Sequence, residues 1–551
     1  MGFSPSARMT ERLHLVLTRV EEMHRDHAIG TEADPVRLEL FNNLYMSIAE
    51  QMGAALENTA VSVTIKERLD FSCAVFDAAG DLIANAPHMP VHLGSMGASV
   101  KSIIEQNPVM AKGDVFVLNA PYNGGTHLPD ITVVSPVWEE DGDEIIFYVA
   151  SRGHHTDVGG LTPGSMPPDS RVVEDEGVLI DNWKLVDKGV FREAETREIL
   201  MSGPYPCRSP DTNIADLKAQ VASCEKGAQE LRRMVRQFGR EVVDAYMQHV
   251  QDNAEECVRR AIVKLKDAEF VYPMDPDYDG EAREIRVKLT VDKAAREATV
   301  DFTGTTRQLP TNYNAPEPVM RAAVLYVFRL LVEDNIPMNE GVMKPLKIIV
   351  EKGSMIAPVY PAAVIAGNVE VSQAVTSALL LALGVQAAAQ STMNNVTWGD
   401  DRRQYYETVC GGSGAGVLND GTGHPGTSGV HTHMTNSRLT DPEVLEWRYP
   451  VLLEEFSIRE GSGGAGKFRG GDGTRRRIRF LEPMTAAILA GHRVAPPPGL
   501  LGGGPGALGR TRIVRADGRV DELRSADKTE MAAGDLFWLD TPSGGGCLPE
   551  E

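Results

Sequence analysis

Cysteine is scarce in this sequence: six residues among 551, and no two of them form a C-x-x-C pair. The chain therefore offers neither a zinc ribbon nor a redox dithiol, and such sparse use of cysteine is typical of a reducing compartment. The N-terminal segment, MGFSPSARMTERLHLVLTRVEEMHRDHAIG, contains basic residues but no apolar core of signal-peptide length. We therefore expect a cytoplasmic protein.

Long apolar runs and a basic surface are also missing. The most apolar segment, SALLLALGVQAAA (Ser377–Ala389), is too short to span a bilayer, so we expect a buried helix and no membrane contact. The formal net charge is −22, whereas nucleic-acid binding needs a concentrated basic surface. We interpret the one dense basic run, TRRRIRF (Thr474–Phe480), as a solvated strand face. No nucleic-acid partner is expected.

Nucleotide-binding loops are absent as well. The pattern G-x-x-x-x-G-K-[ST] does not occur, and the lysine in GSGGAGKFRGG has no serine or threonine beside it. A serine-hydrolase motif fits around Ser413 only if its spacing is relaxed. The sequence therefore predicts no nucleotide site within this chain.

Residues 1–211 are predicted to form a strand-rich α/β lobe. Apolar residues from Leu38 to Leu56 repeat at helical spacing. The segment CAVFDAAGDLIANA predicts a hairpin that turns at Ala79-Gly80. Two further strands are predicted in DVFVLNAPY and EIIFYVASRG.

The remainder is predicted as a helical hairpin over residues 212–271 and a second lobe over 272–551. Apolar residues follow a heptad-like stripe until Gly239, after which a second helix is expected. An inserted hairpin is the simpler interpretation, and a two-helix arm for a partner is the alternative. In the second lobe, helices are expected at Arg321–Glu333 and Ser372–Gln390, and the glycine runs are interpreted as tight turns of a β-rich unit. The fold class is mixed α/β (α+β).

Two polar clusters stand where predicted strands meet glycine turns. NGGTHLPDITVV places His127 and Asp130 before a β-branched run, and VASRGHHTDVGG places His154 and His155 after another. Imidazole and carboxylate are ligands for zinc, manganese or iron. We predict a divalent-metal site from His127, Asp130 and one histidine of the pair, with His92 as a possible fourth ligand.

His155 and Asp157 are the candidate catalytic residues, and Asp157 could instead orient a ligand imidazole through its second ring nitrogen. The alternative for all these residues is structural: turn residues that satisfy backbone groups, with His92 packed in the core. A third group, His424, His431 and His433, could line one face of a strand. Ordered loop histidines that make backbone hydrogen bonds are the favoured interpretation of that group.

At these motifs the chain resembles the hydantoinase B/oxoprolinase family. The likeness is carried, in the family's order, by SCAVFDAAGDLIANAPHMPVHLGSMG, GDVFVLNAPYNGGTHLPDITVVSPV, SRGHHTDVGG, HTHMTNSRLTDPEVLEWRYPV, GSGGAGKFRGGDG and GDLFWLDTPSGGGC. That family includes B subunits of ATP-dependent hydantoinases, the C-terminal half of 5-oxoprolinases, and related acetone and acetophenone carboxylase subunits.

The resemblance implies a separate A-type ATPase subunit with an actin-like fold, which holds ATP and magnesium and phosphorylates the substrate. It also implies a metal, manganese in the carboxylases, bound by two histidines and an aspartate. His127, Asp130 and His154 match that pattern best.

The function that follows is the metal-bearing B subunit of an ATP-dependent cyclic-amide hydrolase, acting on a hydantoin, oxoproline or similar lactam within a hetero-oligomer. Two alternatives stay open. One is a subunit of an ATP-dependent ketone carboxylase, and the other is a non-catalytic scaffold for the A subunit.

Overall fold

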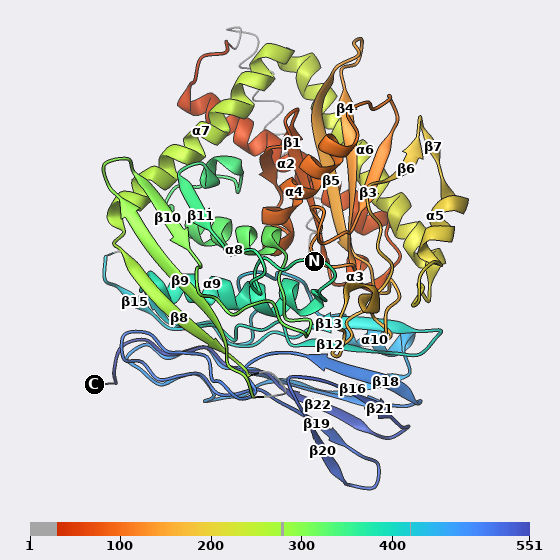
Figure 1. Cartoon of the computed structure of the whole chain (residues 1–551), viewed down its shortest axis with the longest axis vertical. Coiled ribbons are helices and arrows are strands. Elements are labelled where there is room, and N and C mark those ends of the chain that lie inside the picture. The colour runs from red at the N-terminus through yellow and green to blue at the C-terminus, as the bar shows by residue number, and fades with distance from the viewer. Residues whose placement is uncertain (1–29, 277–279, 419, 551) are drawn as a thin grey trace, which may run out of the picture.

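The computed structural model describes residues 30–276, 280–418 and 420–550 (Figure 1). The N-terminal segment that lacks a signal-peptide core lies outside these ranges. Helices and several separate sheets alternate along the chain, which confirms the mixed α/β class. Among the described residues, no helix is long and apolar enough to cross a membrane.

A seven-stranded antiparallel sheet forms the centre of the N-terminal lobe, in the order β2-β1-β5-β4-β3-β6-β7. Its strands are β1 (Phe71–Asp77), β2 (Leu82–Asn85), β3 (Val115–Leu118), β4 (Asp130–Trp138), β5 (Ile145–His154), β6 (Trp183–Asp187) and β7 (Val190–Phe191). The predicted β1–β2 hairpin is confirmed. Gly80 turns it with a φ of 83°, a conformation that glycine adopts without steric penalty.

Helices cover both faces of this sheet. Alternate residues of β1 enter different apolar clusters: Val75 packs towards α2 (Pro35–Thr59) and α6 (Pro210–Phe238), and Phe76 packs towards α4 (Pro90–Gln106). Side chains on a strand alternate between faces, so a sheet buried on both sides needs apolar residues at consecutive positions. The short α5 (Glu193–Leu200) packs beside α6.

The predicted break at Gly239 is present, with α6 on one side and α7 (Arg240–Lys264) on the other. Helix α6 packs on β4, β5 and α2 and shares their apolar cluster. The domain boundaries at 212 and 272 stay a prediction.

A second, four-stranded sheet follows in the order β11-β10-β9-β8 and packs on α9 (Ser372–Ala382), beside α8 (Glu317–Leu330). Its strands are β8 (Ala268–Met274), β9 (Arg283–Asp292), β10 (Glu297–Asp301) and β11 (Leu346–Ile349). The prediction that a helix runs to Gln390 was wrong, because α9 ends at Ala382 and Gly384 follows with a φ of 70°.

Two sheets pack together at the bottom of Figure 1 around Trp398, Tyr405 and Phe480. One has the order β13-β12-β18-β21, the other β16-β17-β22-β19-β20. Their strands are β12 (Asn395–Gly399), β13 (Gln404–Thr408), β16 (Val451–Ile458), β17 (Thr474–Phe480), β18 (Met484–Leu489), β19 (Arg510–Val514), β20 (Val520–Leu523), β21 (Ala526–Met531) and β22 (Leu536–Asp540). Smaller elements are the β14 (Gly416–Val417) and β15 (Gly423–His424) pair, α3 (Val63–Lys66) and α10 (Pro442–Arg448).

Many glycines of the last third are not turn residues, contrary to our expectation. Backbone N–H groups of Gly464, Gly471 and Gly544 bond to carbonyl groups of other glycine-rich segments. A Cβ atom on Gly412 would overlap the carbonyl oxygen of Gly471. Glycine is required here because backbones approach backbones, not because the chain reverses.

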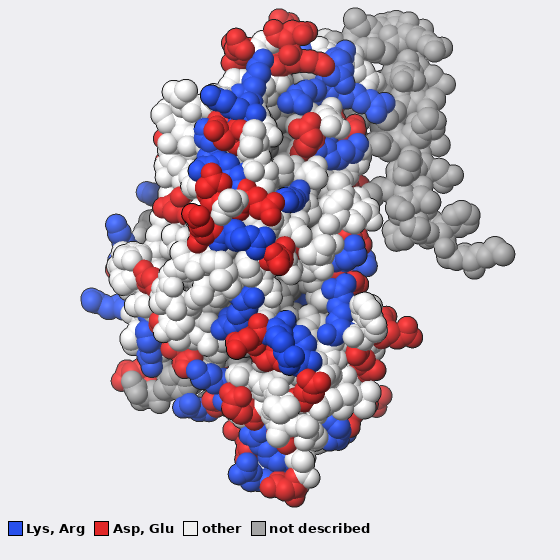
Figure 2. All heavy atoms as spheres, turned by 90° about the vertical axis from the view of Figure 1, so that its right-hand side faces the viewer, with Lys and Arg blue, Asp and Glu red and all other residues white. Residues whose placement is uncertain are grey.

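The basic run TRRRIRF forms β17, with Arg475, Arg477 and Arg479 partly exposed. Arg476 departs from the predicted solvated face: its side chain is buried against Glu407. On the face drawn in Figure 2, basic and acidic side chains are intermixed.

Candidate metal centre

The two polar clusters of the sequence meet at one end of the neighbouring strands β4 and β5. The antiparallel register pairs Asp130 directly with His154. His127 lies in the turn just before β4, where its carbonyl accepts from the Asp130 N–H. Asp130 Oδ1 is 2.9 Å from His127 Nε2 and 3.1 Å from His154 Nδ1. All three residues are buried, and one potential ligand atom of each lies within 4.8 Å of the others.

The second oxygen of Asp130 is held by other groups. Asp130 Oδ2 accepts from Thr126 Oγ1 and Asn368 Nδ2, each at 3.1 Å, and lies 3.1 Å from His92 Nε2. His92 stands on α4 and reaches the other carboxylate oxygen, Oδ2, rather than Oδ1. The structure thus brings His92 to Asp130 as a neighbour of Oδ2, while the three-residue cluster forms at Oδ1.

Charge at the cluster suits a divalent cation. Burial raises the pKa of Asp130, but the His127 and His92 imidazoles and hydrogen bonds from His127 and His154 outweigh it and hold that pKa well below its usual value. Burial lowers the pKa of His154, only partly opposed by Asp130. An ionised carboxylate and a neutral imidazole are the forms that bind metals.

Hydrogen bonding at the cluster is incomplete. His127 Nδ1 and His154 Nε2 are buried without a hydrogen-bond partner. Unsatisfied polar atoms are rare in protein interiors, and a dense group of them is expected where an ion or water completes a site. The donor set, the burial and these unpaired nitrogens therefore fit a bound divalent metal.

Four residues around the cluster were not singled out in the sequence. Tyr406 on β13 stacks on His154 with ring centroids 4.4 Å apart, and its hydroxyl donates to Asn395 Oδ1 over 2.8 Å. Asn395 in turn donates to Glu370, whose pKa burial raises to about 8. Asn368 and Glu370 share the π-helical turn Gly367–Val371, a feature often found at functional sites.

Arg152 is the residue that the sequence could have revealed. It stands two positions before His154 on β5, so strand alternation puts both side chains on one face. The buried guanidinium donates to Thr132, Ser95 and Ser99 hydroxyls at 2.6–2.8 Å. Asn368 and Tyr406 come from distant segments and give no local signal.

The structure does not bring His155 and Asp157 into the cluster. His155, the residue that follows β5, lies on the α6 side, where its Nε2 is 3.0 Å from Gln220 Oε1. Asp157 accepts from the N–H groups of Gly159 and Gly164 and pairs with Arg208 at 3.0 Å. These contacts organise a loop; the catalytic roles stay a prediction.

Of the C-terminal histidines, His431 and His433 lie in a loop, as expected, and His424 is in β15. The expected backbone hydrogen bond is present for His424, at the Pro425 carbonyl, whereas His433 Nδ1 lies 3.4 Å from the Tyr326 hydroxyl instead. Both ring nitrogens of His431 are buried without partners. The neighbouring Thr432 carbonyl accepts from Gln373 on α9.

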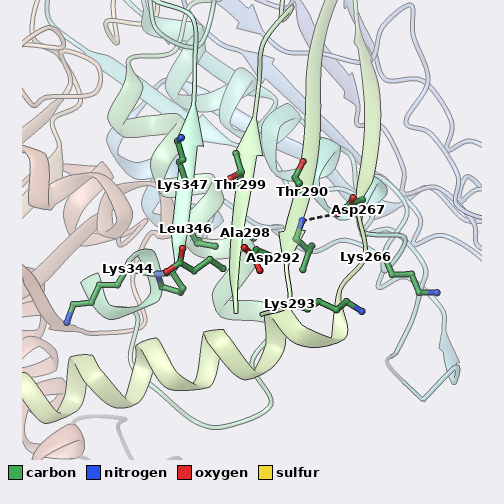
Figure 3. Close-up of a pocket in the computed structure, with 13 residues that line it drawn as sticks. Lys266, Asp267, Thr290, Asp292, Lys293, Ala298, Thr299, Lys344, Leu346 and Lys347 are labelled. Carbon is green, nitrogen blue, oxygen red and sulfur yellow. Dashed lines mark hydrogen bonds between the residues drawn. The ribbon is translucent and has the colours of Figure 1, made fainter. Parts of the chain in front are cut away.

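A wider hollow of about 1000 Å³ lies elsewhere, on the β8–β11 sheet (Figure 3). Lys266, Lys293 and Lys344 line it together with Asp267 and Asp292. Its lining includes no residue of the histidine–aspartate cluster, so the volume of a hollow does not identify the metal centre.

Comparisons with known proteins agree with this architecture. The family model described as Hydantoinase B/oxoprolinase matches residues 34–548. The chain is 44% identical to 5-oxoprolinase 1 of Arabidopsis thaliana over 93% of its own length and 42% of that protein. It thus spans about two fifths of the length of that protein, and likewise of the 5-oxoprolinase of Dictyostelium discoideum, to which it is 41% identical.

Two solved structures share the fold. ATP-dependent caprolactamase from Pseudomonas jessenii superposes with a TM-score of 0.82 at 24% identity, covering 94% of this chain and 91% of that one. Nucleotide-free acetone carboxylase also gives 0.82, at 18% identity, covering 96% and 76%. The family match spans nearly the whole described chain, and this protein belongs to the Hydantoinase B/oxoprolinase family.

Proposed function

We propose that this chain is the metal-bearing subunit of an ATP-dependent cyclic-amide hydrolase that opens a hydantoin, 5-oxoproline or related lactam. The observation that carries the proposal is the buried cluster of His127, Asp130 and His154. The names of its relatives support the substrate class: 5-oxoprolinase 1 at 44% identity, and a caprolactamase with the same fold.

His127, Asp130 and His154 would hold the metal, with zinc, manganese and iron as candidates. A divalent metal at such a site lowers the pKa of a bound water and polarises a carbonyl group. The protein's contribution is placement. Thr126 and Asn368 hold Asp130 Oδ2, which leaves Oδ1 facing the two imidazoles.

Burial of the cluster also favours the proposed reaction. The cluster is closed from solvent on the β13 side by Tyr406, which covers the His154 ring. Exclusion of bulk water strengthens electrostatic interactions with a reacting carbonyl. It also protects an activated substrate from reaction with water elsewhere.

Activation by ATP is assigned to a partner. An amide resists attack because resonance stabilises it, and phosphorylation of its oxygen supplies a leaving group. The sequence lacks the phosphate-loop pattern G-x-x-x-x-G-K-[ST]. From the family to which the chain belongs, we infer a hetero-oligomer in which an A-type ATPase subunit holds ATP and magnesium.

The test is reconstitution with that ATPase subunit and 5-oxoproline or hydantoin as substrate. We expect ATP-dependent ring opening by the wild type and none by Asp130→Ala, with the partner still captured by the variant. Full turnover by Asp130→Ala would refute the site. Loss of partner capture together with activity would favour the scaffold alternative.

Ketone carboxylation is the second candidate, favoured by the acetone carboxylase fold. The same complex supplied with acetone, bicarbonate and ATP separates the two. Incorporation of labelled bicarbonate without ring opening of any cyclic amide would select the carboxylase.

A further inference from the structure

A second hollow, of about 600 Å³, opens on the α6 side of the β5 end. It lies where β5 ends, where α6 and α3 begin, and where α10 meets the turn before β13. His155 lines it, whereas its neighbour His154 belongs to the metal cluster. His154 Nδ1 lies at Asp130, whereas His155 Nε2 lies at Gln220 of α6, and the lining of the hollow includes none of the three cluster residues, so the two sites are separate. The volume is typical of a small-molecule pocket.

The hollow has two unpaired acceptor oxygens among its buried lining residues. Asp216 is fully buried; its Oδ1 accepts from the N–H groups of Val61 and Ser62, while Oδ2 has no partner. Asn213 is 2% exposed; its amide nitrogen donates to His155 Nδ1 and to the Asp157 carbonyl, while Oδ1 has no partner. A buried acceptor without a donor is unfavourable.

His155 does not supply that donor. Its Nε2 is engaged by Gln220 and its Nδ1 by Asn213. The inner part of the lining therefore carries the negative charge of the Asp216 carboxylate. It also has two oxygens without a hydrogen-bond donor, Asp216 Oδ2 and Asn213 Oδ1. A primary ammonium group has three N–H donors and a positive charge, which matches this arrangement.

Arginines and a tryptophan occupy the other part of the lining. Arg402 and Trp447 are exposed, Trp447 by 84%. Arg448 pairs with Glu67 at 3.7 Å, and Arg403 pairs with Asp400 at 2.8 Å and with Glu482 at 2.6 Å. Guanidinium groups bind carboxylates in a bidentate manner, and an indole ring offers an apolar surface for a short aliphatic chain.

We propose that this hollow binds a zwitterionic amino acid, with its ammonium group at Asp216 and Asn213 and its carboxylate at the arginines. Resting on the proposed function with a lactam such as 5-oxoproline as the substrate, the ligand belongs to the class that the reaction releases; a hydantoin would instead release a carbamoyl amino acid, which has no ammonium group. Hydrolysis of a lactam adds water across the C–N bond, so the carbonyl carbon becomes a carboxylate and the nitrogen an ammonium. The hollow would then hold product outside the metal cluster.

The direct test is isothermal titration calorimetry of the full chain with L-glutamate and with 6-aminohexanoate. We expect at least one of them to bind. Glutarate, which lacks the ammonium, and butylamine, which lacks the carboxylate, should bind at least tenfold more weakly. Absence of heat with both amino acids would overturn the proposal and leave water as the occupant.

Variants locate the binding. Asp216→Asn keeps an oxygen for the two backbone donors but removes the charge, so affinity should fall at least tenfold. Arg402→Ala and Trp447→Ala alter exposed side chains, which keeps the test valid if Asp216→Asn does not fold. Arg519→Ala, on an exposed arginine of the β19–β20 turn, is the control and should bind as the wild type does. Unchanged binding in Arg402→Ala, Trp447→Ala and any folded Asp216→Asn would overturn the assignment.

Asp130→Ala separates this proposal from the proposed function. Retained binding in Asp130→Ala, with ring opening lost, supports two distinct sites. Loss of binding in Asp130→Ala would place the amino acid at the metal cluster and refute the second site. If the wild type binds the amino acid but opens no ring, the binding site in the hollow is supported and the proposed hydrolase activity is refuted.

Discussion

The ring of Tyr406 lies flat on the imidazole of His154, with 4.4 Å between centroids and 20° between planes. The two residues come from different sheets, β13 and β5. Arg68 contacts this tyrosine at two points: its Nη1 donates to the Tyr406 carbonyl over 3.0 Å, and its guanidinium carbon is 4.9 Å from the ring centroid. A residue of β13 therefore positions a residue of the cluster on β5.

This stack predicts that Tyr406→Ala weakens metal binding by roughly 10–100-fold, as loss of a group that orients a ligand does. Tyr406→Phe is the matched control, because it keeps the ring and loses only the hydrogen bond to Asn395. Its affinity should stay near that of the wild type. Competition with a chelator measures both, and equal affinities for the alanine variant and the wild type would refute this role for the stack.

Asn368 gives a second prediction, because its amide donates to Asp130 Oδ2. Asn368→Ala should reduce metal affinity by roughly tenfold. Asn368→Asp should reduce it further if the new carboxylate is ionised, since it would then repel Asp130 and donate no hydrogen bond. The same competition assay ranks the three proteins. An affinity for Asn368→Asp above that of Asn368→Ala would mean that residue 368 itself binds the ion.

Glu176 predicts a pH-dependent stability. It is fully buried and accepts from the N–H groups of Val364 and Ile365, just before the turn that carries Asn368. Burial raises its pKa from 4.5 to about 8. Because the folded state then holds the proton more tightly than the unfolded state, this group's contribution is most favourable below pH 4.5 and is lost as the pH rises to about 8.

Glu176→Gln removes that dependence. Relative to the wild type, the variant should gain stability between pH 5 and pH 8, by an amount on the order of a few kcal/mol. Urea midpoints of both proteins across this range provide the measurement. A difference that does not change with pH would show that Glu176 titrates as an ordinary carboxylic acid.

Arg476 and Glu407 join β17 to β13 through two hydrogen bonds, of 2.7 and 2.9 Å, with both side chains buried. Arg476→Met should destabilise the protein by about 3–5 kcal/mol, because it leaves a buried carboxylate without its partner. Arg477→Met, on the same strand but partly exposed, should cost about 1 kcal/mol or less. Similar urea midpoints for the two variants would contradict this account.

The candidate ligands could be predicted from the sequence because each cluster stands at a recognisable strand end. The meeting of Asp130 with His154 depends on the register of β4 and β5, which no local pattern encodes. Asn368 and Tyr406 reach the cluster from segments far along the chain, so only the folded structure reveals them.

Elements with a strong local pattern were predicted best. The helix around Leu38–Leu56 and the hairpin at Gly80 were confirmed, because apolar period and turn chemistry act over a few residues. The end of α9 and the glycine-rich segments were mispredicted. There, contacts between distant stretches of backbone decide the conformation, as for Gly412 against Gly471.

The measurement that tests the central claim most directly is metal analysis of the purified chain after extensive dialysis. We predict about one zinc, manganese or iron ion per chain in the wild type. His127→Ala/Asp130→Ala should hold none, and His249→Ala, on α7 with its ring nitrogen at the Thr31 carbonyl, should retain it. A wild type that binds no metal even after reconstitution, or a double variant that keeps it, would contradict the proposed site.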